Sequence, residues 1–375
     1  MIQLLYSLIC GSPQQHLSLL SRTLGGAITS SVLFLLLAPR FIRLLKARGI
    51  CEQARDFGGL NAPGKAGTPT MGGILIYGCV LVSAIFWCRL DTNFTVIPLL
   101  AGFALGLVGL VDDLLKVRGQ SSEAGTSRGI KYAGQLCVGV TVAILFLSEG
   151  TSPIDHEATR WSLFAPIFRN GLYVGSAYVL VILAVMIAAS NSVNLTDGMD
   201  GLAAVPVIFV AAVLGGFGYI TGRIDFATYL GYFPATWPQI GQVSYGLPLS
   251  GELMVLAAAI AGAGVGFLWF NAHPASLFMG DTGSMAIGGM LGSMAVVSKQ
   301  EALFFIAGGL FVMEAASTLI QDYVGLKLLG RRILFRAPLH HNMLHRGTAE
   351  TKVTVRLWIV AGLFALLALC TLKLR

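Results

Sequence analysis

Residues 178–214 read YVLVILAVMIAASNSVNLTDGMDGLAAVPVIFVAAVL, in which a polar island separates two long apolar runs. The amide and carboxylate side chains of this island recur at every third position: Asn191, Asn194, Asp197 and Asp200. In a helical turn that spacing places them on one side, where they contribute nothing to a hydrophobic core. The pattern therefore predicts two membrane spans joined by a loop that serves a function.

The rest of the chain repeats this alternation. Hydrophobic residues make up 55% of the 375 positions and charged residues 11%, with a mean hydropathy of +0.76, whereas soluble domains carry roughly a quarter charged residues. A span needs about 20 mainly apolar residues, and about ten stretches qualify. We predict an all-α polytopic membrane protein that forms a single integral membrane domain over residues 1–375. The spans are expected near 17–38, 71–90, 94–111, 130–148, 172–190, 201–220, 252–270, 282–298, 302–321 and 353–372.

The distribution of basic residues predicts the orientation. Lysine and arginine concentrate in loops that remain in the cytoplasm. With ten spans, loops one, three and nine share one face and hold most of the 25 basic residues. Both termini are therefore expected outside, on the periplasmic side, and the odd-numbered loops in the cytoplasm. The net charge of +7 suits anionic lipid headgroups and phosphorylated substrates.

Five polar motifs fall in odd-numbered loops, so all five are expected at the cytoplasmic face. They are GKAGTPTMGG (64–73), VDDLLK (111–116), NSVNLTDGMDGL (191–202), FNAHPASLFMGDTGS (270–284) and APLHHNMLH (337–345). The even-numbered loops carry only isolated acids. We predict that the five motifs build one site.

The aspartate pair of the second motif indicates that this site is catalytic. Asp112 and Asp113 are expected at the C-terminal end of their helix, where the helix dipole disfavours anions. Pairing with Lys116 is the alternative interpretation, but one lysine cannot offset two anions and a dipole. A divalent cation could, and Asp281 with the two aspartates of loop five adds oxygen ligands. Magnesium is the expected metal because its ligands are oxygens, and no Cys/His set has zinc spacing.

The N-terminal ends of two predicted helices, together with a lysine, further predict a pocket that binds pyrophosphate. Asp281 precedes an apolar run and could simply be a helix N-cap. However, the N-termini of the spans near Gly201 and Thr282 present free N–H groups to an anion. Lys65 adds a point charge for phosphate.

Two further features are interpreted with alternatives. His340 and His341 lie in a basic interfacial loop, where histidines often bind headgroups or nothing. Glu314 lies inside the ninth span, where a carboxylate is costly in lipid, so we expect it to face the bundle interior.

The motifs GTPTMGG, VDDLLK, NLTDGMDGL, WFNAHPASLFMGDTGS and APLHH together resemble those of the bacterial phospho-N-acetylmuramoyl-pentapeptide transferases. These enzymes, also called translocase I, belong to the polyprenyl-phosphate N-acetylhexosamine-1-phosphate transferase superfamily. The resemblance runs from loop one to the last span. It implies ten transmembrane helices, outside termini, a Mg²⁺-dependent cytoplasmic site, a multi-pass protein of the bacterial inner membrane, and a homodimer.

The resemblance also implies a reaction. Phospho-MurNAc-pentapeptide would pass from UDP-MurNAc-pentapeptide to undecaprenyl phosphate, giving lipid I and UMP in the first membrane step of peptidoglycan synthesis. Direct displacement and a two-step route through a phosphoryl-enzyme both remain open.

Site residues carried over from the resemblance fall into three groups. The catalytic group is Asp112, Asp113, Asp281, His340 and His341. Asp281 is the main Mg²⁺ ligand, assisted by Asn194 and Asp113. The substrate-binding group is Lys65, Thr70, Asn191, Asn194, Asp197, Asp200, Asn271 and Phe278, with Phe278 placed to stack on uracil. Asn342 stands at the third place of a three-histidine motif, where asparagine can still hydrogen-bond a phosphate or sugar.

Two other functions remain as alternatives. A sister transferase that uses UDP-N-acetylglucosamine is the nearest, although TPTMGG and APLHH favour the muramoyl-pentapeptide enzyme. A cation-coupled transporter would place its acids near the bilayer midplane between repeats, whereas these acids are expected at cytoplasmic helix ends. The lipid bilayer is the expected environment, and no nucleic-acid partner is expected.

Overall fold

The structure, a computed structural model, describes residues 18–52, 67–119, 125–154, 156–166, 171–230 and 248–373. Its long helices are α2 (Leu19–Ala47), α3 (Gly73–Trp87), α4 (Asn93–Arg118), α5 (Arg128–Leu147), α7 (Tyr178–Thr196), α8 (Ala204–Thr221), α10 (Glu252–Asn271), α11 (Gly280–Val297), α13 (Gly309–Leu319) and α15 (Glu350–Cys370). Shorter helices are α6 (Glu157–Arg160), α9 (Ile224–Leu230), α12 (Glu301–Ala307) and α14 (Leu339–His345). Short turns of other helix types are η1 (Gly175–Ala177), η2 (Pro248–Gly251), η3 (Ile320–Leu328) and η4 (Thr371–Lys373). Strands β1 (Ser162–Leu163) and β2 (Leu172–Tyr173) form one small antiparallel pair.

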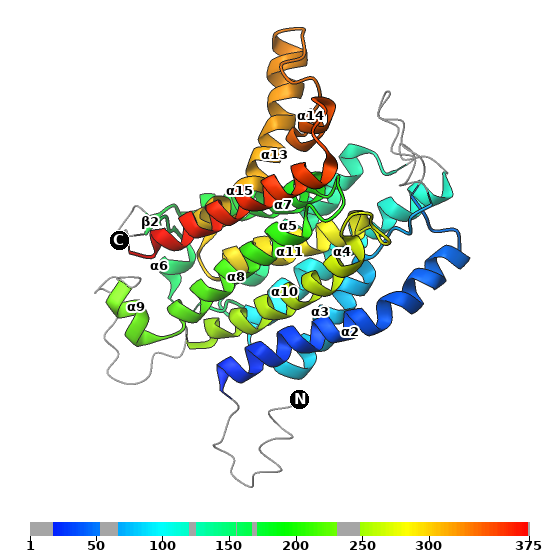
Figure 1. Cartoon of the computed structure of the whole chain (residues 1–375). Coiled ribbons are helices and arrows are strands. Elements are labelled where there is room, and N and C mark those ends of the chain that lie inside the picture. Colours follow the sequence, from blue (N-terminus) through cyan, green and yellow to red (C-terminus); the bar gives the residue numbers. More distant parts are fainter. Residues whose placement is uncertain are drawn as a thin grey trace.

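The helical class is confirmed, and each predicted span contains a helix or a helix pair. In the described residues, seven helices are long and apolar enough to cross a membrane. The ninth predicted span is broken, because α12 and the α13–η3 helix meet at a bend of 83°. Figure 1 shows α13 leaving the bundle steeply beyond this bend.

Several predicted boundaries shift. The first span was expected to end at residue 38, but α2 continues to Ala47, and the fifth was expected over 172–190, but α7 covers Tyr178–Thr196. The third span was expected to end at residue 111, but α4 continues to Arg118, so the VDDLLK motif is helical and lies in the last turns of α4. The ninth span was expected to end at residue 321, but η3 extends the helix to Leu328.

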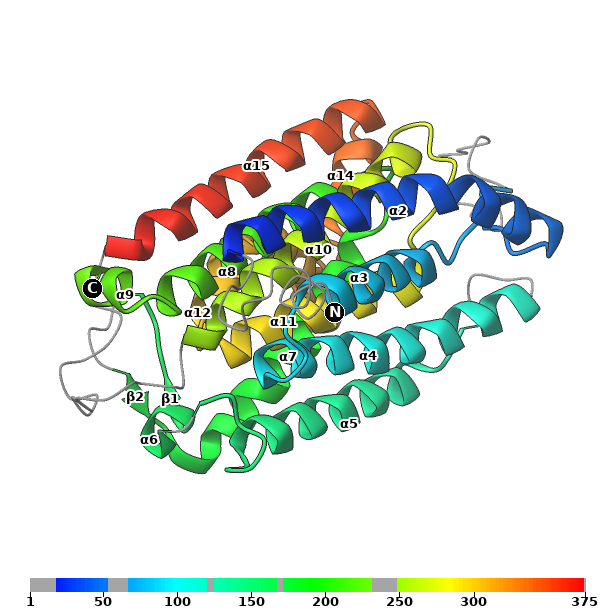
Figure 2. The same cartoon turned by 90° about the horizontal axis from the view of Figure 1, so that it is seen from below.

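Helix α11 occupies the middle of the bundle in both views (Figures 1 and 2). Every residue from Thr282 to Val297 is buried, and the helix packs mainly against α4 and α7. Small residues allow this close approach. A Cβ atom on Gly109 of α4 would lie 2.2 Å from the carbonyl oxygen of Asp281, so only glycine fits at this crossing. The crossing sets the first turn of α11 directly beside α4.

A buried ion pair joins the N-terminal ends of α2 and α10. The Arg22 guanidinium donates to both carboxylate oxygens of Glu252, at 2.7 and 2.5 Å. Both side chains are almost fully buried, at 7% and 4% exposure. The backbone N–H of Arg89 also donates to Glu252, and Arg22 donates to the carbonyl of Trp87, the last residue of α3. The pair thus connects three helices.

We predict that Glu252→Ala is strongly destabilising, because it leaves the Arg22 guanidinium buried without its counter-ion. Breaking a buried pair typically costs about 3–5 kcal/mol, and a lower midpoint of thermal unfolding in detergent would reveal it. The double variant Arg22→Met/Glu252→Met should recover much of the loss, since neither charge then remains buried. Asp91→Ala, at the exposed pair with Arg89, is the control and should leave the midpoint unchanged. A midpoint equally unchanged by Glu252→Ala would contradict this account.

Candidate active site

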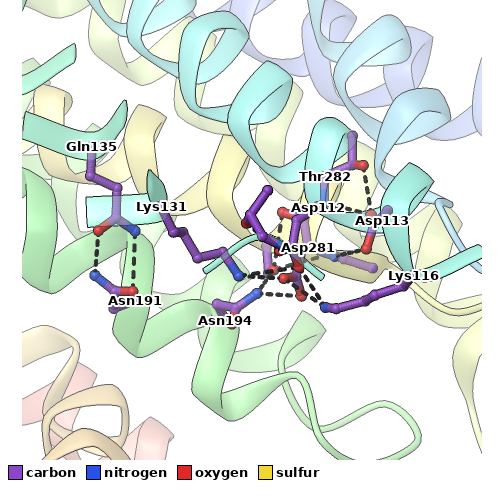
Figure 3. A network of polar contacts seen from close by, with 12 residues as sticks. Asp112, Asp113, Lys116, Lys131, Gln135, Asn191, Asn194, Asp281 and Thr282 are labelled. Atoms are coloured by element: carbon purple, nitrogen blue, oxygen red, sulfur yellow. Dashed lines mark hydrogen bonds and ion pairs between the residues drawn. The ribbon is translucent and has the colours of Figure 1, made fainter. Parts of the chain in front are cut away.

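Three carboxylates from two helices meet at one end of the bundle (Figure 3). Asp112 and Asp113 come from the last turns of α4, and Asp281 comes from the first turn of α11. One oxygen from each carboxylate lies within 4.8 Å of the others. Asp112 and Asp113 are buried, at 2% and 4% exposure. The structure therefore brings together the aspartate pair and the distant Asp281 that the motifs singled out.

Asp113 caps the N-terminus of α11. Its Oδ1 accepts a hydrogen bond from the backbone N–H of Asp281 at 3.1 Å. Its Oδ2 accepts from the backbone N–H and the hydroxyl of Thr282, at 2.9 and 2.7 Å. First-turn N–H groups have no partner within their own helix, and the helix dipole favours an anion there. Both Asp113 oxygens are thus used to hold α11, and through it Asp281.

This geometry corrects the N-cap alternative for Asp281. Helix α11 begins at Gly280, and its N-cap position, Met279, makes no side-chain cap hydrogen bond. Gly280 adopts a φ of +75°, a conformation that favours glycine, and a Cβ atom there would lie 2.7 Å from Asp113 Oδ2. The capping carboxylate comes from α4, and the Asp281 side chain is left to face other groups.

Two lysines bridge Asp112 and Asp281. Lys116 Nζ lies 2.6 Å from Asp112 Oδ2 and 3.0 Å from Asp281 Oδ2. Lys131 Nζ, from α5, lies 2.5 Å from Asp281 Oδ2 and 3.4 Å from Asp112 Oδ2. The pairing with Lys116, which was the alternative interpretation of the aspartate pair, therefore occurs for Asp112 and extends to Asp281. Both ammonium groups contact the same two oxygens, which consequently face one shared polar space.

Lys131 is a site residue that the motifs missed. It lies in the first turn of α5, and the sequence signal is weak because lysines at span ends commonly extend to the interface without any partner. Thr126 was also missed. Its backbone N–H and hydroxyl both donate to Asp112 Oδ1, at 2.8 and 2.5 Å, which orients the other oxygen of Asp112 toward the lysines.

Asn194 fixes the second oxygen of Asp281. Its side-chain amide donates to Asp281 Oδ1 at 2.8 Å and contacts the Ser284 hydroxyl at 2.9 Å. Asn191, one turn earlier on α7, instead exchanges two amide hydrogen bonds with Gln135 of α5, at 3.1 and 2.9 Å. In this structure Asn194 therefore belongs to the carboxylate cluster, and Asn191 joins α5 to α7 beside it (Figure 3).

The donor set fits a hard divalent cation. Asp112 Oδ2 and Asp281 Oδ2 face the same space, and an all-oxygen set of carboxylates is the kind that Mg²⁺ binds. Asp113 reaches the same cluster, but both of its oxygens already accept hydrogen bonds from α11. The cluster is compatible with Mg²⁺ without identifying the metal.

Asp200 and Asn271 join loop five to loop seven. Asp200 Oδ2 lies 2.9 Å from His273 Nδ1 and accepts from the backbone N–H of Ala275. Asn271 accepts from the backbone N–H of Gly201 and donates to the Leu277 carbonyl, both at 2.9 Å.

Asp200, His273 and Glu350 form a group apart from the one that contains Asp112 and Asp281. The idea that Asp200 adds an oxygen ligand to that first cluster is therefore not supported by the geometry. Asp197 lies in the turn after α7 and is half-buried.

The TPTMGG segment lies alongside loop seven. The backbone N–H of Phe278 donates to the Pro69 carbonyl, and that of Gly72 donates to the Phe278 carbonyl, both at 2.8 Å. Thr70 is buried within this segment, and Phe278 is half-buried. Lys65 lies outside the described residues.

The histidine motif reaches the same end of the bundle through α14. His340 is fully buried, and its ring centroid lies 4.2 Å from that of His341. A Cβ atom on Gly198 would lie 2.5 Å from His340 Nε2, so the histidines adjoin the turn of loop five. Glu314 is fully buried and contacts His340, as expected for a carboxylate that faces the interior. Asn342 is buried on the same short helix.

Two protein-family models match the chain. Residues 95–299, more than half of the chain, match the model of glycosyl transferase family 4. Residues 65–76 match the phospho-N-acetylmuramoyl-pentapeptide-transferase signature 1. The first match contains the carboxylate cluster, and the second contains the segment that pairs with loop seven.

We predict that Lys131→Met tightens divalent-cation binding. The Lys131 ammonium contacts the Asp281 oxygen that would serve as a ligand and also the nearby Asp112 oxygen, so it competes with a cation for this position. Two unit charges about 4 Å apart interact by about 4 kcal/mol at an effective dielectric constant of about 20. Removing even part of the repulsion between the lysine and the bound cation should therefore lower the apparent Kd for Mn²⁺ by about tenfold or more. Titration of Mn²⁺ followed by electron paramagnetic resonance measures this change.

The matched control is Lys327→Met, which removes an exposed lysine that lies over the ring of Tyr323. Its Mn²⁺ affinity should equal that of the wild type. Unchanged or weaker binding by Lys131→Met would show that the lysine and the cation do not compete for these oxygens.

Proposed function

Because the chain belongs to glycosyl transferase family 4, we propose that it transfers phospho-MurNAc-pentapeptide from UDP-MurNAc-pentapeptide to undecaprenyl phosphate. The products would be lipid I and UMP. The two sequence matches and the apolar helices together support the broader assignment, a multi-pass membrane phospho-sugar transferase of the phospho-N-acetylmuramoyl-pentapeptide transferase family.

The observation that carries this proposal is the convergence of Asp112, Asp281 and two lysines on one polar space. In the reaction, an oxygen of the lipid phosphate forms a bond to the sugar-linked phosphorus. The bond from that phosphorus to the bridging oxygen breaks, and UMP leaves with the electron pair. Both reactants are anionic, so the main task is to offset their repulsion with fixed positive charge. Lys116 and Lys131 would contact the phosphate oxygens.

Asp112 is the residue that we assign to proton transfer. Its Oδ1 is held by Thr126, whereas its Oδ2 contacts the two ammonium groups. Asp113 is unsuited to this role because α11 uses both of its oxygens. In direct displacement, Asp112 Oδ2 would accept the proton of the lipid phosphate. Asp113 would act by positioning Asp281.

Mg²⁺ would be held mainly by Asp281, which Asn194 orients. When bound, the ion offsets negative charge on the diphosphate. This arrangement revises the expected ligand set, because Asn194 turns its amide nitrogen toward Asp281 and Asp113 is bonded to α11.

The remaining motif residues would serve the nucleotide. Phe278 would stack on uracil beside Thr70, and Lys65, Asp197 and Asp200 would line the same pocket, with Asn191 and Asn271 holding the surrounding loops. His340 and His341 would face the diphosphate. We further propose that the protein lies in the bacterial inner membrane as a homodimer, with this site in the cytoplasm and both termini in the periplasm.

Release of UMP by the purified protein tests the proposal. We expect UMP and a lipid-linked product from UDP-MurNAc-pentapeptide with undecaprenyl phosphate and Mg²⁺, and neither product when the lipid or the metal is omitted. UDP-N-acetylglucosamine should be a poor donor. Faster turnover of that donor would identify the sister transferase instead, and uptake of a solute into proteoliposomes without UMP release would indicate a transporter.

The assigned roles of the aspartates predict separable effects. Asp112→Asn should lower kcat by about 10²–10⁴-fold, the usual contribution of a proton-transfer residue, and should leave UDP-sugar affinity nearly unchanged. Asp281→Asn should nearly abolish turnover and weaken Mn²⁺ binding. Asp91→Asn, at an exposed loop position, is the control. Wild-type kcat for Asp112→Asn at every Mg²⁺ concentration would overturn its assigned role.

A further inference from the structure

Glu314 and His340 form a fully buried pair between α13 and α14. Both side chains have 0% exposure. Glu314 Oε2 lies 3.1 Å from His340 Nδ1 and 3.4 Å from the backbone nitrogen of His340. A carboxylate within an apolar helix is costly unless it is paired and hydrogen-bonded. The pairing explains how Glu314 is accommodated, but not why the chain keeps a carboxylate there.

The direction of the imidazole ring supplies a reason. A carboxylate accepts, so the proton lies on Nδ1 and the free position is Nε2. His340 Nε2 is buried and has no hydrogen-bond partner among the described residues. It faces loop five, since a Cβ atom on Gly198 would lie only 2.5 Å away. The absence of a side chain at Gly198 leaves room for the ring beside this turn.

The Glu314 carboxylate is also suited to stabilising positive charge on the ring. Its second oxygen, Oε1, is buried and has no hydrogen-bond partner in the part of the chain that the structure describes. Among these residues the carboxylate therefore hydrogen-bonds to His340 alone. A neighbouring anion requires Nε2 to carry a proton and donate it in a hydrogen bond. An imidazolium formed in this way would be balanced by Glu314, as metal-bound and catalytic histidines are oriented by a carboxylate behind them.

We propose that Glu314 is a positioning residue that orients His340, so that Nε2 donates to a phosphate oxygen of the bound UDP-sugar beside the 197–200 turn. This inference rests on the proposed function, since it takes the diphosphate of a nucleotide sugar as the group that Nε2 meets. It assigns Glu314, on a helix outside the five motifs, to the same reaction.

The test compares Glu314→Gln with a matched buried carboxylate. Glutamine can still accept the hydrogen bond from Nδ1, so it preserves an anchor between α13 and α14 but removes the negative charge. We expect kcat to fall by about 10- to 100-fold, as for other carboxylates behind a functional histidine, with an unchanged midpoint of thermal unfolding. Glu314→Asp should recover part of kcat. The control is Glu301→Gln, whose carboxylate is also buried and bonds to Tyr178, and it should retain wild-type kcat.

A double variant separates positioning from an independent contribution. Residues that act as one unit show non-additive losses, so in the His340→Gln background Glu314→Gln should lower kcat by less than about twofold. Gly198→Ala should also lower kcat, because its Cβ would displace His340 Nε2. Gly216→Ala is its control, since a Cβ there meets nothing within 4 Å.

Wild-type kcat for Glu314→Gln, or fully additive losses in the double variant, would overturn the inference. A loss of kcat accompanied by a lower unfolding midpoint that Glu314→Asp does not rescue would do the same, because it indicates an anchor only. If the wild type uses UDP-N-acetylglucosamine instead, the proposed function fails, and the same variants assayed with that donor still decide the role of Glu314. If it uses neither donor, both proposals fail.

Discussion

The hydrogen bonds from the first turn of α11 to Asp113 are the contact on which the site depends. Helix α11 is buried along its whole length after this turn, so N–H groups left without an acceptor there would be costly. Asp113 supplies that acceptor from α4, and the close crossing at Gly109 allows it to reach. The same contact brings Asp281 beside Asp112, which creates the three-carboxylate cluster.

The cluster divides its carboxylates between two tasks. Asp113 satisfies backbone donors, whereas Asp112 and Asp281 each turn one oxygen toward Lys116 and Lys131. Thr126 and Asn194 bind the other oxygens of these two aspartates, so their orientations are set before any substrate arrives. Such preorganisation suits phosphoryl transfer, in which the protein mainly positions anions and offsets their charge.

Much of the fold and of the site could be predicted, for identifiable reasons. Apolar length is a local property, so every predicted span contains a helix. Asp112, Asp113 and Asp281 could be expected to meet because their motifs fall in odd-numbered loops, which share one face of the membrane. The contact partners could not be predicted in the same way. Asp281 could be interpreted as the N-cap of the helix that follows it, and Lys131 resembled an ordinary lysine at the end of a span. Asp200 was expected to add a ligand to the Asp112–Asp281 cluster, but it lies in a separate group.

The sequence by itself determined that this is a helical membrane protein with acidic and histidine motifs grouped at one end of its helices, because hydropathy and charge act over short stretches of chain. Tertiary structure alone decided which oxygen of Asp112 and of Asp281 faces the lysines, that a lysine from α5 enters the site, and that Glu314 lies behind His340. Those outcomes depend on contacts within about 3 Å between residues distant in sequence, and helix crossings set them where no local pattern can.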